Sequence, residues 1–411
     1  MPIPKCPDVP ALTGSNSNNI ELTVHLVTPM FGGGVVAREV DETHPIRETS
    51  IRGQLQFWWR ATAGAKYDNS KALNEAHSKI WGSTNYKSKV NINIEQPKNK
   101  KIVSYSDVTQ KLQPLKYALF PFAKNNQTDQ AHGVKQGLTF SLRIQSVANE
   151  LTPSQWQEVQ TAIIAWINFG GIGSRTRRGC GSIYSKNYSF ADSKSAQIWI
   201  NDNGSDRILD WPTISKRSYC FPKLGETIAA WSESISLMQY FRQGSDFGRN
   251  LGNKGDNHPG GRSRFPEPDT IRRLTNRYDP KHQPSNKMPQ GFPRAEFGLP
   301  IIFQFKDKWT GDPVDTTLVP NINDAERFAS PLILKAIACS EAEAFPAIIV
   351  LNGKRVKSCR LMLNNNSVSN SERVPIKSDS FKTIDPSPMN GHESAIDAFL
   401  AYAQNEGYLP N

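Results

Sequence analysis

Cysteine is scarce in this sequence, and no long apolar run occurs. The five cysteines among 411 residues are odd in number, widely scattered and free of any CxxC pair, so neither a disulfide framework nor a zinc finger is supported. No stretch approaches the ~18 consecutive apolar residues of a membrane span. Residues 1–19 lack the apolar core of a secretory signal. We therefore expect a soluble, cytoplasmic protein without a membrane partner.

Motifs for catalysis and metal binding are also missing. The seven histidines form no HxxxH or HExxH pattern, and no DxD pair is present. His25, in a predicted strand, and His44, in a predicted loop, could each meet a phosphate, but no second group pairs with either. We predict no catalytic residue, no metal ion and no cofactor.

The charge balance points to an acidic partner. Lys and Arg number 49 against 38 Asp and Glu, which gives a formal charge of +11, although the charged fraction is an ordinary 21%. A surplus of this kind favours association with polyanions. At about 150 residues per domain, the length predicts two domains.

The first half has a clear order of elements. Alternating apolar residues predict strands, and apolar residues at helical spacing predict helices. A capping box at Thr152 and Gln155 marks the start of the second helix. The order is strand, helix, two strands, helix and strand, at residues 20–28, 50–64, 90–94, 138–144, 153–169 and 181–188. This β-α-β-β-α-β series predicts a ferredoxin-like domain over residues 1–190.

The second half is less regular, and we predict a further α+β domain of related layout over residues 191–411. Its strands are expected at 217–221, 297–305, 332–338 and 347–351, and its helices at 226–242 and 393–404. Residues 242–293, rich in Gly, Pro and Arg, are predicted to be one long basic loop. Loops of that length are usually functional or disordered.

The glycine-rich loop 170–181 is the sharpest candidate for a binding site. Gly171 and Gly173 would let a ligand approach the backbone, and Arg175, Arg177 and Arg178 would supply fork-shaped donors for phosphate oxygens. The loop follows a helix and lacks a Lys-Ser/Thr end, so it is not a nucleotide-triphosphate P-loop. A solvated turn that caps a helix is the alternative.

Two other sets of arginines are candidates for phosphate contacts. Arg52 and Arg60 lie eight residues apart on one face of the first predicted helix, where a plain solvated face is the alternative. Arg262 and Arg264 belong to the basic loop, whose interleaved acidic residues weaken the prediction. Trp58 could stack on bases, but at its helical spacing we expect it in the core.

Six motifs in order, between about residues 20 and 340, resemble the RAMP superfamily of CRISPR proteins, and more narrowly the first subunit of the type III-B Cmr effector complex. They are Thr28-Pro29-Met30-Phe31-Gly32-Gly33-Gly34, Ile51-Arg52-Gly53-Gln54-Leu55-Gln56-Phe57-Trp58-Trp59-Arg60, the loop 170–181, Arg262-Ser263-Arg264-Phe265-Pro266-Glu267-Pro268-Asp269, Phe292-Pro293-Arg294-Ala295-Glu296-Phe297-Gly298-Leu299-Pro300 and Phe328-Ala329-Ser330-Pro331-Leu332-Ile333-Leu334-Lys335. The resemblance implies two ferredoxin-like domains across a basic cleft.

The resemblance also implies a function. The first subunits of type III-B Cmr complexes act in antiviral defence as non-catalytic subunits. They contact the 3′ region of guide RNA and target RNA beside other Cmr subunits. The sequence departs from common RNA-recognition folds because it has no strand rich in aromatic residues. Two alternatives stay open: a metal-independent endoribonuclease of the guide-processing RAMP type that uses His25 or His44, and a scaffold for acidic proteins.

Overall fold

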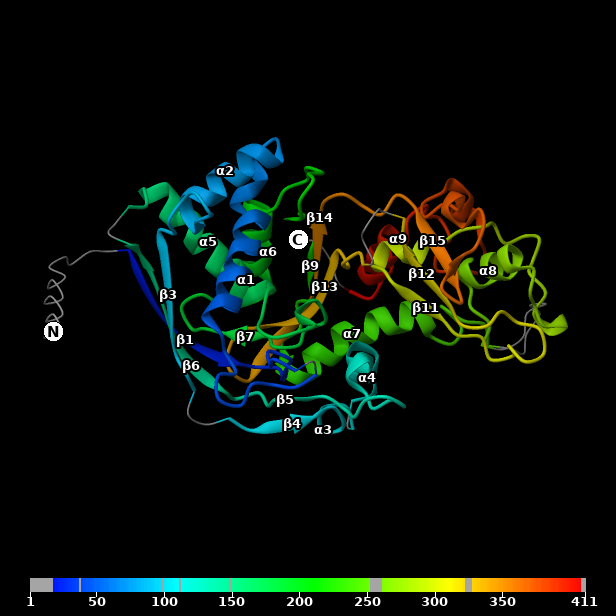
Figure 1. Cartoon of the computed structure of the whole chain (residues 1–411), viewed down its shortest axis with the longest axis horizontal. Coiled ribbons are helices and arrows are strands. Elements are labelled where there is room, and N and C mark those ends of the chain that lie inside the picture. Colours follow the sequence, from blue (N-terminus) through cyan, green and yellow to red (C-terminus); the bar gives the residue numbers. More distant parts are fainter. Residues whose placement is uncertain are drawn as a thin grey trace, which may run out of the picture.

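The computed structural model describes residues 18–407, except residues 37, 98–99, 111, 148–149, 252–260 and 322–326. Within these residues the chain is a mixture of helices and antiparallel sheets, which confirms the α+β class. Figure 1 shows an elongated molecule, with the first half of the chain at one end and most of the second half at the other.

The first lobe is built on a four-stranded antiparallel sheet in the order β3-β6-β1-β7. Its strands are β1 (Asn19–Leu26), β3 (Val90–Glu95), β6 (Thr139–Ser146) and β7 (Ile183–Tyr184). The helices of this lobe are α1 (Glu48–Ala61), α2 (Ser70–Trp81), α5 (Pro153–Phe169) and α6 (Ser193–Asn203). The alternation predicted for β1 is real, because Leu22 and Val24 are buried while Glu21 and Thr23 are exposed.

Local sequence signals explain where these elements begin and end. Thr152 caps α5 by accepting a hydrogen bond from the Gln155 amide, and the Gln155 side chain accepts one in return from the Thr152 amide. Trp58 is 2% exposed, which confirms that it lies in the core. Strand β7 is shorter than predicted, because the chain turns at Ser185, whose carbonyl accepts from the Tyr188 amide.

A small sheet covers one side of the junction between the lobes. Its order is β2-β5-β4, and two short helices follow β4. The members are β2 (Met30–Phe31), β4 (Ile102–Ser104), β5 (His132–Val134), α3 (Tyr105–Thr109) and α4 (Gln113–Leu119). Helix α4 packs against α7 (Thr227–Gln243), the long helix of the second half.

Two long strands, β13 (Leu332–Ala338) and β14 (Glu343–Asn352), form the centre of the molecule. Three short strands pair with β14: β8 (Thr213–Ile214), β9 (Tyr219–Cys220) and β10 (Gly225–Glu226). Every residue of β13 is buried. Ile333 and Ile337 join the core of the first lobe, while Leu332 and Leu334 join a second core with α7.

The distal lobe has its own antiparallel sheet and a third core. The sheet contains β11 (Ile301–Phe303), β12 (Thr316–Pro320), β15 (Cys359–Leu363) and β16 (Asn366–Ser367). Helix α9 (Ala395–Asn405) packs back on α7.

The region 242–293 differs from the single loop that the sequence predicts. It contains the helix α8 (Glu267–Thr275), although residues 252–260 lie outside the described residues. Helix α8 has no apolar periodicity because it buries Glu267, Asp269 and Arg272 as well as Ile271. In the sequence, a helix that buries paired charged residues has the same polar pattern as a solvated loop.

Candidate nucleic-acid interface

The glycine-rich loop 170–181 folds back along β2 and so contacts the sequence motif of residues 28–34. The Ser174 amide donates to the Phe31 carbonyl at 2.8 Å, and the Gly181 amide donates to the Pro29 carbonyl at 2.9 Å. The Thr28 hydroxyl donates to the Gly179 carbonyl at 2.7 Å. The loop is therefore a fixed part of the fold.

Close backbone packing accounts for the glycines of this loop. Gly173 has a φ of 79°, and a Cβ there would lie 2.6 Å from the Phe31 carbonyl oxygen. Gly171 is buried, and a Cβ there would lie 2.5 Å from the Gly181 carbonyl oxygen. These contacts are with the protein itself, so ligand approach at Gly171 and Gly173 stays a prediction.

A groove runs between α1 and this loop. It consists of two concavities, of about 380 and 110 Å³, that share Gln54. The larger one is lined by Gly33, Ser50 and Gly173 among others, and the smaller one by Phe57 and Arg177 among others. We call this the α1 groove.

Arg177 lines the smaller concavity, and Arg175 and Arg178 are its neighbours in the part of the loop that meets β13. The Arg177 guanidinium donates to the Ser330 carbonyl and lies 5.8 Å from the centroid of the Phe57 ring. Arg178 donates to the Leu332 carbonyl at 2.9 Å. The structure thus brings these three predicted residues together and fastens two of them to the chain before and at the start of β13.

Arg242, at the end of α7, joins this group from a distant part of the sequence. Its guanidinium donates to the Tyr117 hydroxyl at 2.7 Å. Burial is the main cause that lowers the pKa of Arg178 to about 10; Tyr117 opposes it, and the positive charges of Arg175, Arg242 and Arg177 lower this pKa further, each by less. Sequence reasoning did not assign Arg242 or Tyr117, because nothing in the sequence places them beside the loop.

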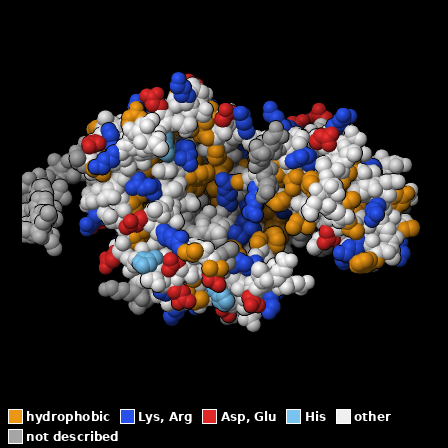
Figure 2. Space-filling view, viewed as in Figure 1, with side chains coloured by type: hydrophobic (Ala, Val, Ile, Leu, Met, Phe, Trp, Pro, Cys, Tyr) orange, Lys and Arg blue, Asp and Glu red, His pale blue; other side chains and the backbone are white. Residues whose placement is uncertain are grey.

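We call Arg175, Arg177, Arg178 and Arg242 the arginine cluster. All four are half-buried, and the ion pairs found among the described residues involve other arginines. Burying like charges without counter-charges is costly. Figure 2 shows Lys and Arg side chains gathered in the hollow between the two lobes. The cluster therefore has the electrostatics of an anion site.

The other predicted arginines are held elsewhere. Arg52 donates to the Ser88 hydroxyl and to the Val90 carbonyl, both at 2.9 Å. Arg60 lies 3.2 Å from the His77 Nε2. Neither is among the residues that line the α1 groove.

Arg262 and Arg264 are also engaged inside the protein. The Arg262 side chain is only 8% exposed and forms an ion pair with Asp269. Arg264 donates to the Asn250 side-chain oxygen at 2.8 Å and to the Asp246 carbonyl. The expectation that these two residues contact RNA stays untested, and their guanidinium groups already have protein partners.

A buried charge network lies near α8 in the distal lobe. The Asp312 carboxylate accepts two hydrogen bonds from Arg272, at 2.8 and 2.9 Å, and lies 2.9 Å from the His282 Nδ1. Although burial acts to raise the pKa of Asp312, Arg272 and His282 hold it below its usual value. Asp307 is also close enough for a metal site. We assign no metal there, because Arg272 occupies both oxygens of Asp312.

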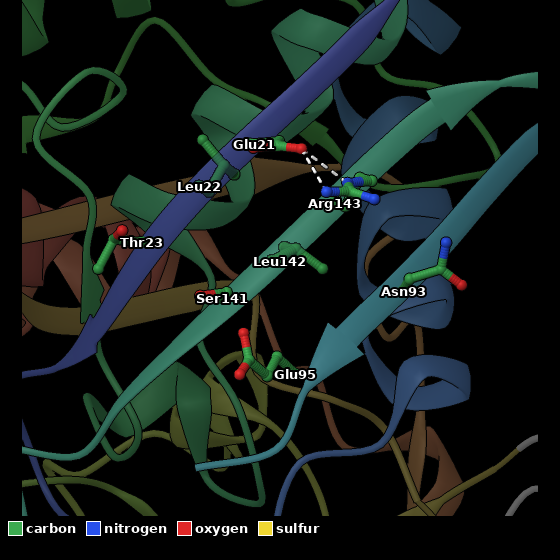
Figure 3. Close-up of a pocket in the computed structure, with 8 residues that line it drawn as sticks. All are labelled: Glu21, Leu22, Thr23, Asn93, Glu95, Ser141, Leu142 and Arg143. Atoms are coloured by element: carbon green, nitrogen blue, oxygen red, sulfur yellow. Dashed lines mark hydrogen bonds and ion pairs between the residues drawn. The ribbon is translucent and has the colours of Figure 1, made fainter.

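The open face of the first sheet is polar. Figure 3 shows Glu21, Thr23, Asn93 and Arg143 on this face, with an ion pair between Glu21 and Arg143. His25 lies on the same strand, 3.2 Å from the Thr139 hydroxyl and 3.4 Å from Glu341. Among these side chains only His25 is aromatic, and its ring lies 5.9 Å from that of Tyr184 on the neighbouring strand β7.

The first half of the chain is similar in sequence to known proteins. The family model of the RAMP superfamily matches residues 23–184. In Pyrococcus furiosus, the CRISPR system Cmr subunit Cmr1-2 is 29% identical over 175 residues, which cover 38% of this chain and 89% of that protein. Subunit Cmr1-1 is 27% identical over 171 residues, which cover 40% of this chain and 46% of that protein.

Solved structures show a more distant likeness over more of the chain. The apo crystal structure of Cmr1 from P. furiosus has a TM-score of 0.48 and 16% identity, and the match covers 83% of this chain and 89% of that one. A chain in the type III-B Cmr-beta complex bound to cognate target RNA has a TM-score of 0.43 and 12% identity, with 82% and 95% covered.

The helices described in the structure include none long and apolar enough to cross a membrane. The family match covers the second half of β1, the motif of residues 28–34 that contains β2, the helices α1 and α5, and the whole glycine-rich loop. Residues 23–184 of this chain therefore match the RAMP superfamily, and this part of the chain is similar in sequence to the Cmr1 subunits of CRISPR Cmr systems.

Proposed function

We propose that this chain is a non-catalytic, cytoplasmic, RNA-binding subunit of a type III-B CRISPR (Cmr) interference complex, where it contacts the 3′ region of guide RNA and target RNA in antiviral defence. One observation carries the proposal: the arginine cluster is half-buried at the junction of the lobes without a carboxylate partner among the described residues. The names of the relatives, which are Cmr subunits, support the assembly with other Cmr subunits. The proposed RNA partners are guide RNA and target RNA.

The chemistry of the cluster fits a phosphodiester backbone. A guanidinium group offers several N–H donors in a fork that matches phosphate oxygens. Phosphates would return the counter-charge that the protein does not provide, so binding would stabilise the groups that are costly in the free protein. The α1 groove, which shares Arg177 with the cluster, would take the neighbouring nucleotides.

We also propose a domain arrangement for this function. The order β3-β6-β1-β7, with α1 and α5 as connections, supports a ferredoxin-like unit in residues 1–190. In the second half, β13 and the short strands β8, β9 and β10 all pair with β14, and the helices α7 and α9 belong to the same half of the chain. This arrangement supports a related unit in residues 191–411. The arginine cluster would then lie in the basic cleft between the two units.

Fluorescence anisotropy of labelled single-stranded RNA with the full chain tests this function. At about 50 and 200 mM salt we expect affinity to fall steeply, with the RNA intact on a denaturing gel. Replacing both Arg175 and Arg177 with alanine should weaken binding about equally for all sequences. It should also reduce the salt slope by about 0.7 for each phosphate that the variant no longer neutralises.

A matched control removes two positive charges outside the groove. Arg143 and Arg207 are exposed and form ion pairs on the first lobe, and their joint replacement by alanine should leave the salt slope unchanged. A decrease in affinity that depends on RNA sequence would contradict phosphate contacts. Cut RNA would instead favour the endoribonuclease alternative.

A further inference from the structure

Phe120 is an exposed aromatic residue beside the arginine cluster. It begins a Phe-Pro-Phe turn after α4, and the two rings of this turn have different surroundings. Phe122 packs into the core and stacks on Phe31, with ring centroids 4.8 Å apart. Phe120 is 64% exposed. Since Phe122 anchors the turn, core packing gives no reason for a second aromatic ring at Phe120.

The turn that carries this ring is held firmly. The Arg38 guanidinium donates to the carbonyls of Pro121, Ala123 and Asp129 at 2.6, 2.7 and 2.8 Å. Helix α4, directly before the turn, packs on α7. A ring on such a support is presented in one orientation, as a binding platform requires.

Arg175 covers one side of the Phe120 ring. Its guanidinium lies 5.7 Å from the ring centroid. Among the described residues its side chain has no hydrogen-bond partner, and its Nε is buried. Arg175 also has a left-handed backbone, with a φ of 58°, which is unfavourable for a residue with a side chain. An unpaired cation in a strained conformation beside an exposed ring is typical of a prepared ligand site.

We propose that Phe120 stacks on an unpaired base of single-stranded RNA while Arg175 binds a phosphate of the same strand. This rests on the proposed RNA-binding function and specifies what the site takes. A base can lie on the face of the ring that Arg175 leaves open. In a duplex the bases are stacked on each other and cannot reach the ring, so the site selects single-stranded segments.

The test separates stacking from phosphate contacts by using two labelled oligomers of equal charge. One is an oligoadenylate of about 12 nucleotides, a length suited to sites of this kind. The other is an abasic ribose-phosphate oligomer of the same length. Anisotropy titrations with the full chain give the affinity of wild type and of Phe120→Ala for each oligomer. We expect Phe120→Ala to weaken oligoadenylate binding by roughly 5- to 100-fold, the effect of removing one stacked base, and to leave abasic binding and the salt slope unchanged.

Three further variants sharpen the result. Phe120→Trp should retain oligoadenylate binding, whereas Phe120→Leu, which keeps an apolar side chain, should weaken it as much as alanine does. Trp309 is 89% exposed and lies 5.8 Å from the Lys308 Nζ, on a turn of the distal lobe. Trp309→Ala is therefore a matched control that removes an exposed ring beside a cation, and it should change neither affinity.

The outcomes distinguish this inference from the proposed function. Salt-sensitive binding of both oligomers that Phe120→Ala leaves unchanged, or weakens equally, overturns the stacking and leaves the phosphate site standing. Equal affinity of wild type for the oligoadenylate and for its duplex also overturns it. Failure of wild type to bind either oligomer overturns the proposed function and the stacking together.

Discussion

Two groups of arginines in this molecule have opposite electrostatic surroundings. In the distal lobe each of three buried guanidinium groups has its own carboxylate: Arg262 pairs with Asp269, Arg272 with Asp312, and Arg294 with Glu267. The arginine cluster at the lobe junction has carbonyls, a tyrosine and aromatic rings as neighbours. Both groups come from segments that look basic in the sequence.

The difference separates structural from binding roles. A buried ion pair is neutral as a unit, and removing one partner leaves a charge that the fold cannot solvate. An unpaired cluster remains positive and attracts an anion. The number of arginines in a segment therefore says less about binding than the presence of carboxylates within reach of each one.

The largest effect is expected from breaking a pair. Asp312→Ala removes the carboxylate that accepts two hydrogen bonds from Arg272 and leaves only the contact of Arg272 with Asp269 at 3.4 Å. It should lower the free energy of unfolding by about 3 kcal/mol, measured by urea denaturation. The exposed pair of Lys308 and Asp315 offers a control, since Asp315→Ala should cost at most ~1 kcal/mol. RNA affinity of the folded Asp312→Ala protein should be retained; a decrease as large as in the Arg175 and Arg177 variant would refute the division into two groups.

Arg242 tests the membership of the cluster. Arg242 and Arg277 both belong to the segment 242–293 that the sequence predicts to be a basic loop. Arg242 contacts Tyr117, whereas Arg277 is exposed in the distal lobe. We expect Arg242→Ala to reduce RNA affinity about tenfold at ~100 mM salt and to lower the salt slope by the amount for one phosphate. Arg277→Ala should change neither, and anisotropy titrations of the two variants side by side provide the check.

Lys335 is a buried lysine whose hydrogen-bond partner is a carbonyl and not a carboxylate, so it resembles the arginine cluster. It is completely buried in β13, donates to the Gly170 carbonyl at 2.8 Å, and burial lowers its pKa to about 7. Between pH 7 and the ordinary lysine pKa the unfolded chain holds a proton there that the folded chain does not. The free energy of unfolding should therefore rise with pH in this window, by about 1 kcal/mol per unit. Lys335→Met should remove this increment, which denaturation at pH 7, 8 and 9 measures; the same pH slope in both proteins would contradict a neutral lysine.

The smallest effect concerns the backbone of Arg175. Glycine adopts its left-handed conformation without penalty, so Arg175→Gly should stabilise the protein by up to about 1 kcal/mol. The same change removes a cluster cation and should weaken RNA binding. Thermal denaturation and anisotropy on one preparation give both numbers, and a variant with lower stability as well as lower affinity would show that Arg175 has a structural role.

Much of the first lobe could be predicted because its signals are local. Alternation identified β1, β3 and β6, and the capping box at Thr152 identified the start of α5. The sheet β2-β5-β4 has strands of two or three residues, too short for any period to appear. Helix α8 was missed because its buried face is charged, with Glu267 and Asp269 paired to arginines from elsewhere.

The candidate site was only half predictable. Arg175, Arg177 and Arg178 were found because glycines and arginines are adjacent in one loop. Arg242 and Phe120 come from other elements, and only the packing of α4 on α7 brings them to the loop. Arg262 carried a usable warning, since Asp269 follows seven residues later and forms its ion pair.

The carbonyls that hold the loop arginines have a consequence for how the protein is assembled. Arg177 and Arg178 bind carbonyls of Ser330 and Leu332, which lie 153 and 154 residues further along the chain. During synthesis the loop is therefore complete long before the strand that orients it exists. A fragment that ends near residue 190 would contain these arginines and lack their supports, so competence to bind RNA would appear only after the chain has been made as far as β13.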